Sequence, residues 1–138
     1  ITLVIVGIAL LGVFFLEMPN AFSRARTRVV TQNELQDEFG IQVKLIGVTA
    51  EGGLVDVRFK ILSPEKAAEF FSDAEKLPKL MTGEGAIISV SQTDPHEYKL
   101  VEDGMIFMLF PNQGGAIKPG TPVTIILGDI HLEPIEAQ

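Results

Sequence analysis

The order of apolar and polar residues divides the chain into an uncharged N-terminal stretch and a longer part in which the two kinds alternate. Residues 1–16 contain no charged side chain. As a helix they would be roughly 24 Å long, at a rise of about 1.5 Å per residue, against a hydrocarbon core of about 30 Å. They carry no polar stripe of the kind found on helices of soluble proteins. We therefore predict a single transmembrane anchor over residues 1–18, and we expect that further residues precede Ile1.

Residues 19–40 are predicted to form a basic connector that leads into a short capped helix. Thr31 and Glu34 have the spacing of a capping box, in which each side chain accepts a hydrogen bond from the backbone N–H of the other residue. Gly40 is typical of the left-handed residue that follows a helix. The helix is therefore expected to end at Phe39.

From residue 41 onward the apolar period changes from that of a helix to that of a strand. The clearest strand is residues 54–62, in which apolar and charged side chains alternate. With residues 41–50 and the glycine turn between the two, it predicts a β-hairpin. Ser63 and Pro64 are typical of a helix start. Further strands are expected at residues 86–91, 98–101, 105–110, 123–127 and 130–135.

This series of short strands predicts the fold class. Seven or eight strands within about a hundred residues, separated by frequent turns, favour a mainly β fold. We predict an immunoglobulin-like antiparallel β-sandwich over residues 41–138, with one or two short helices, on a single N-terminal transmembrane helix.

One strand is unusually apolar and is the first candidate for a docking surface. Residues 105–110 are six apolar residues in a row. Such a run is either a central strand buried on both faces or a strand covered by a partner on one face. The central strand is the favoured interpretation. Under the other, the docking residues are Met105, Phe107 and Leu109 on the strand, with Gly7, Ala9 and Gly12 as small residues that let a neighbouring helix approach the anchor.

Composition excludes several function classes. The chain has no cysteine, which excludes disulfides and thiolate-bound metals. From residue 29 onward it has eight basic and seventeen acidic side chains, and it has no tryptophan and one tyrosine. An acidic domain repels phosphate backbones, so no nucleic-acid partner is expected.

Candidate chemistry is sparse. The two histidines, His96 and His131, are far apart in the sequence and lie in no metal-binding motif. Lys118 lies near glycines, but the Walker pattern needs Gly-Lys-Ser/Thr at the start of a helix, and here a proline follows the lysine. No nucleophile motif is present. We therefore predict no catalytic residue, no metal site and no cofactor.

These observations favour a non-catalytic accessory subunit of a larger membrane complex, with integral membrane subunits as partners. A bacterial respiratory or photosynthetic complex is the expected host. A type IV pilin-like filament subunit is one alternative, although position 5 is Ile rather than the glutamate common in bacterial pilins. A metal-binding or enzymatic periplasmic domain is another.

The side of the membrane depends on the arginines after the anchor. Arg24, Arg26 and Arg28 are expected to contact the headgroups of the lipid bilayer. By the positive-inside rule, these arginines alone would place the domain in the cytoplasm. The rule compares both flanks of the anchor, however, and a basic leader before Ile1 would reverse this orientation. We predict a single-pass membrane protein with an extracytoplasmic, periplasmic domain.

Overall fold

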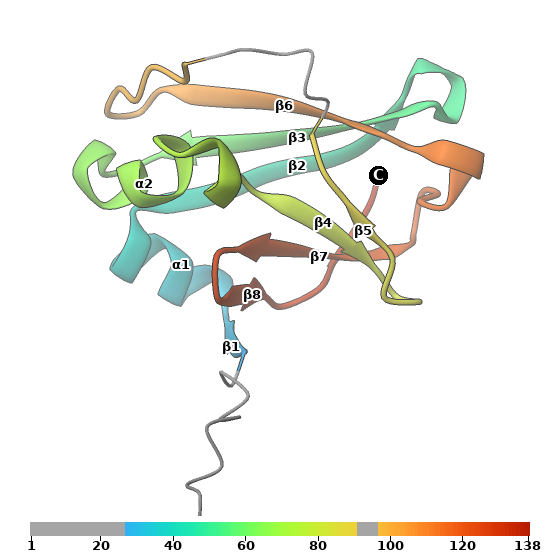
Figure 1. Cartoon of the computed structure of the whole chain (residues 1–138), viewed down its shortest axis with the longest axis horizontal. Coiled ribbons are helices and arrows are strands. Elements are labelled where there is room, and N and C mark those ends of the chain that lie inside the picture. Colours follow the sequence, from blue (N-terminus) through green and yellow to red (C-terminus); the bar gives the residue numbers. More distant parts are fainter. Residues whose placement is uncertain (1–26, 91–96) are drawn as a thin grey trace, which may run out of the picture.

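The computed structural model describes residues 27–90 and 97–138, which form two facing β-sheets with two short helices (Figure 1). One sheet has three antiparallel strands in the order β2 (Ile41–Thr49), β3 (Leu54–Ile61) and β6 (Met105–Pro111). The other has the order β1 (Arg28–Val30), β8 (Ile130–Leu132), β7 (Pro122–Leu127), β4 (Lys79–Thr82) and β5 (Ile87–Ile88), with β9 (Ile135–Glu136) also paired to β7.

The two helices begin and end where local sequence signals place them. Helix α1 (Gln32–Phe39) has the complete capping box of Thr31 and Glu34, and Gly40 follows it with a φ of 62°. Helix α2 (Pro64–Phe71) begins after Ser63, whose hydroxyl accepts a hydrogen bond from the Lys66 N–H. Three 3₁₀ turns complete the described elements: Ala50–Gly52, Ala74–Lys76 and Gln113–Gly115.

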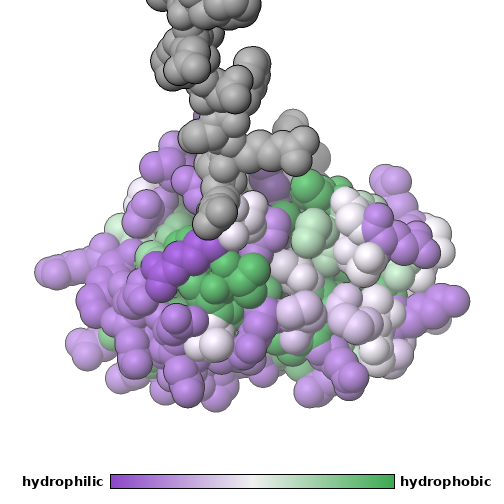
Figure 2. Space-filling view, turned by 90° about the horizontal axis from the view of Figure 1, so that it is seen from below, coloured by the Kyte–Doolittle hydropathy of each residue, from purple (hydrophilic) through white to green (hydrophobic). Residues whose placement is uncertain are grey.

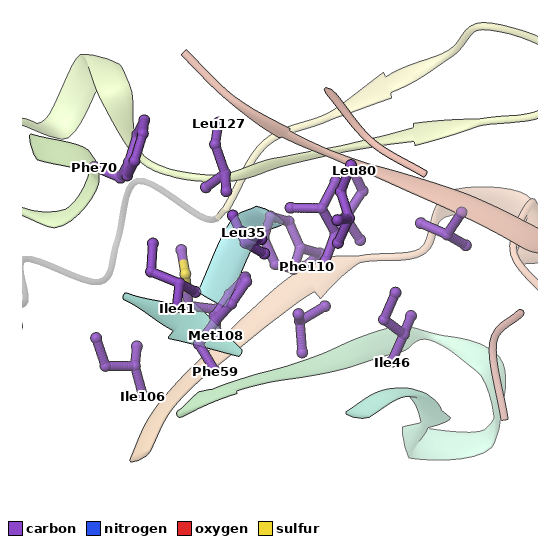
Figure 3. Close-up of a cluster of buried hydrophobic side chains, with 14 of the residues drawn as sticks. Leu35, Ile41, Ile46, Phe59, Phe70, Leu80, Ile106, Met108, Phe110 and Leu127 are labelled. Atoms are coloured by element: carbon purple, nitrogen blue, oxygen red, sulfur yellow. The ribbon is translucent and has the colours of Figure 1, made fainter. Parts of the chain in front are cut away.

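The predicted hairpin is confirmed, and it supplies much of the core. Val55, Val57, Phe59 and Ile61 are fully buried on the inner face of β3. Buried side chains of the neighbouring strand β6 lie beside them, and those of α1 and the second sheet complete the cluster. Figure 3 shows Leu35, Phe59, Leu80, Met108, Phe110 and Leu127 within this cluster.

Asn112 is a buried polar residue that fastens two loops at one end of the sandwich. Its side-chain amide donates to the carbonyl oxygens of Gly52 and Ile117, at 2.9 and 2.7 Å, and its Oδ1 accepts from the Ile117 N–H at 2.9 Å. Asn112 and Ile117 are both almost fully buried. The hairpin turn after β2 and the loop after β6 are thereby held together.

Several predicted elements differ from the structure. The connector was expected to continue to residue 30, but residues 28–30 form β1, parallel to β8. Residues 79–82 form a strand that the sequence pattern did not predict, and residues 98–101 form none. The expected last strand is divided into β8 and β9.

The fold is therefore mainly β, with antiparallel sheets and two short helices. No helix of the described ranges is both long and apolar enough to cross a bilayer. The predicted anchor, residues 1–18, lies outside those ranges.

Candidate docking surface

The outer face of β6 is a row of exposed apolar side chains. Met105, Phe107 and Leu109 are 40%, 58% and 46% exposed, whereas the residues between them point into the core. The favoured sequence interpretation, a central strand buried on both faces, is therefore wrong. The side chains of β6 face solvent on one side because nothing in the described chain packs on that face of the sheet.

Figure 1 shows how this face is oriented in the molecule. The three-stranded sheet forms the upper layer, and β1, where the described chain begins, lies at the bottom. Seen from below, the opposite side has hydrophilic residues around most of its rim, with hydrophobic residues between them (Figure 2). The outer face of β6 therefore points away from the place where the chain enters the domain.

Arg58 on β3 lies directly against the apolar row. It is the register partner of Phe107, and its guanidinium lies 5.2 Å from the centre of the Phe107 ring. The same guanidinium binds Asp56 Oδ2 through Nε at 2.9 Å and Nη2 at 2.8 Å. This cation–π contact partly covers the ring and fixes a charged group beside it.

Both contacts to Asp56 use one carboxylate oxygen. The other, Oδ1, is buried and accepts no hydrogen bond from the described residues. Lys60, the next outward residue of β3, lies 3.6 Å from an oxygen of Asp103. The apolar row is thus bordered by two opposite-charge pairs.

The charge of this sheet differs from that of the rest of the domain. Its three strands carry three basic side chains, Lys44, Arg58 and Lys60, against one acidic, Asp56, a net charge of +2. The other residues from position 29 onward carry five basic and sixteen acidic side chains. The sheet is therefore much less acidic than the rest of the domain, although Arg58 and Lys60 are paired with Asp56 and Asp103.

No family model, no curated protein and no solved structure matches this chain.

The other predicted site residues lie apart from this surface or outside the described ranges. Gly7, Ala9, Gly12, Arg24 and Arg26 lie outside the described residues. The Arg28 side chain binds Glu38 of α1 through two hydrogen bonds of 2.7 and 2.8 Å. Contact of these arginines with lipid stays a prediction.

A groove that the sequence did not predict lies between β5 and the loop after β6. It has a volume of about 360 Å³ and is lined by Ala86, Ile87, Ile88, Ser89, Pro111, Gln113 and Ala116. The lining contains no Asp, Glu, His, Lys or Arg. The described residues also contain no cluster of three His, Asp or Glu able to hold a metal ion, and His96 lies outside them.

The Arg28–Glu38 pair gives a direct test of the local electrostatics. The hydrogen bond and charge of Arg28 hold the pKa of Glu38 below its ordinary value of 4.5. A lowered carboxyl pKa stabilises the fold above the ordinary value, and this stabilisation disappears as the pH falls through the lowered one. We expect Arg28→Gln to raise the Glu38 pKa toward 4.5 in an NMR titration. An unchanged pKa would show that Arg28 does not contact Glu38 in solution.

Proposed function

We propose that this protein is a non-catalytic accessory subunit that docks onto a larger membrane complex through the outer face of β6. The observation that carries the proposal is the exposed row of Met105, Phe107 and Leu109. Large apolar side chains on the surface of a domain, gathered in one row, are typical of an interface. Phe107 is at the centre of the row and is the expected hot spot.

The polar groups beside the row support docking rather than simple exposure. Arginine is enriched at protein interfaces. The Arg58 guanidinium can remain on the Phe107 ring and at the same time donate a hydrogen bond to an acceptor of the partner. An apolar centre with polar groups at its margin is the usual composition of a protein interface.

The anchor, its location and the finer fold type belong to the same proposal. Residues 1–18 would hold the protein in a bacterial membrane, with the domain on the extracytoplasmic side. Because β1 and the outer face of β6 lie on opposite sides of the domain (Figure 1), the docking face would point away from its own anchor. The two facing sheets support a variant of the immunoglobulin-like sandwich, from which the parallel β1–β8 pair departs.

Replacement of Phe107 by serine is expected to release the protein from its complex. Loss of a central aromatic anchor costs about 2 kcal/mol or more of binding, which lowers the bound fraction by at least about tenfold when binding is not saturated. The measurement is a native gel of gently solubilised membranes, probed with an antibody against the domain. Val29→Ser is the matched control, because Val29 is 65% exposed but lies on β1 in the other sheet.

Three outcomes separate the hypotheses. A wild-type protein that migrates in a large complex, with Phe107→Ser free and Val29→Ser retained, is the expected result. Migration of the wild type as a free protein would contradict the proposal. Helical fibres of the protein in electron micrographs of sheared surface material would favour the filament subunit instead.

A further inference from the structure

Within the described residues, β6 has one edge without a paired strand as well as an exposed face. In the described residues β6 pairs only with β3. The Ile61 N–H donates to the Gly104 carbonyl, and the Asn112 N–H donates to the Gly53 carbonyl. Since hydrogen-bonded positions alternate in an antiparallel pair, residues 106, 108 and 110 direct their backbone groups toward β3. Those of Met105, Phe107 and Leu109 point toward the open edge.

This edge is complementary to itself. If a second copy pairs with it antiparallel, centred on Phe107, Met105 of one copy lies opposite Leu109 of the other. All three outward residues then form hydrogen-bonded pairs, with about two bonds each. A shift of the register by two residues brings Asp103, with a φ of 61°, or Pro111, which has no N–H, into the ladder. The centred register is therefore the best one.

The charges agree with that register. Across the joined sheet, Asp56 pairs with Leu109, Leu109 with Met105 of the second copy, and that residue with the second copy's Lys60. Asp56 and Lys60 of the two copies lie at opposite ends of this row, and each is already paired within its own copy, with Arg58 and Asp103, so the register brings no unpaired like charges together. In the central row each Arg58 is already neutralised by its own Asp56. β6 itself has no charged side chain, whereas most of the domain surface is acidic and repels a second copy.

We propose that two copies of this chain pair through the open edge of β6 and form one continuous six-stranded sheet. The two-fold axis is perpendicular to the sheet, so both outer faces remain on the same side. The dimer thereby joins two rows of Met105, Phe107 and Leu109 into one apolar surface. The inference extends the proposed docking function, because it makes the doubled surface the part that meets the larger complex.

Cysteine cross-linking of the full chain in mild detergent tests the register. The native chain has no cysteine, so each variant reports only on its own position. At Phe107 the two Cα atoms would lie about 5.5 Å apart, within the range of a disulfide. At Met105 the two copies of the residue would be separated by about 13 Å along the strand. Phe107→Cys should therefore cross-link, and Met105→Cys and Leu109→Cys alone should not.

Phe107→Cys also removes the central aromatic side chain, so two further measurements use variants that keep Phe107. A mixture of Met105→Cys and Leu109→Cys should cross-link, because the register places these two residues opposite each other. In sedimentation equilibrium, Leu109→Pro should yield monomers, because it removes an outward N–H, while Leu109→Ala should retain more dimer. Val29→Cys is the control for random collision.

The results that would overturn the proposal are equally definite. Equal cross-linking of all single variants means that the copies do not meet in this register. A wild-type monomer without any cross-link leaves the edge to a strand of another protein or to lipid. If the native gel still shows the large complex in that case, only the proposal of a dimer is wrong, and the proposed docking function is unaffected.

Discussion

Replacement of Gly40 by alanine is expected to lower the free energy of unfolding by about 3 kcal/mol or more, as the sum of two costs. Gly40 has a φ of 62°, a conformation that costs an L-residue about 1–2 kcal/mol. A Cβ atom there would lie 2.5 Å from Ser63 Cβ and 2.9 Å from the Ser63 backbone nitrogen. That contact cannot be relieved by a side-chain rotation, because the neighbour is the backbone at the start of α2.

Gly40 contacts three elements, so a movement of Ser63 away from the added Cβ would also displace their ends. It ends α1, precedes β2, and its carbonyl accepts the N–H groups of Leu62 and Ser63 at 2.7 and 3.1 Å. Chemical denaturation of the variant measures the loss. Gly114→Ala is the matched control, since Gly114 has a similar φ of 66° and nothing within 4 Å of the added Cβ. Equal losses in the two variants would mean that the contact with Ser63 is relieved at no cost.

Replacement of Asn112 by alanine is expected to cost about 3 kcal/mol as well. It removes three hydrogen bonds and leaves the buried N–H and carbonyl of Ile117 without the partners they have now. An unsatisfied buried polar group costs about 1–3 kcal/mol, and here two are created together. Gln113→Ala is the control, because Gln113 is the exposed neighbour in the same loop.

The aspartate variant separates the roles of the two ends of the amide. Asn112→Asp retains an acceptor for the Ile117 N–H but places a carboxylate against two carbonyl oxygens. The variant should lose less free energy of unfolding relative to the wild type at pH 4 than at pH 7, because a protonated carboxyl group can donate a hydrogen bond to one of the two carbonyl oxygens. A loss that does not change with pH would show that the donors of Asn112 contribute little.

The features predicted from the sequence are those that depend on near neighbours. Thr31, Glu34 and Gly40 set the bounds of α1 because a cap and a left-handed terminator act within one helical turn. Ser63 does the same for α2. The alternation of β3 was sufficient because a half-buried strand has a period of two whatever its partners are.

The features that the sequence did not predict depend on distant partners. β1 and β4 are only three and four residues long, too short for a period, and they exist because β8 and β7 pair with them. The six apolar residues from 105 to 110 favoured a strand buried on both faces over a strand covered by a partner on one face. Only the arrangement of the sheets shows that no described element covers the outer face of β6, so that three of its residues form a surface.

The parallel pairing of β1 with β8 has a consequence for how the domain is made. Val30 accepts a hydrogen bond from Glu133 at 2.9 Å, and its register partner is Leu132, about a hundred residues later in synthesis. Contacts this distant form late. While the ribosome is still translating β8, β1 has no partner, so the first strand of the domain to be synthesised is among the last to be fixed. The pairing of β1 is therefore expected among the last steps of folding, at the point where the chain enters the domain.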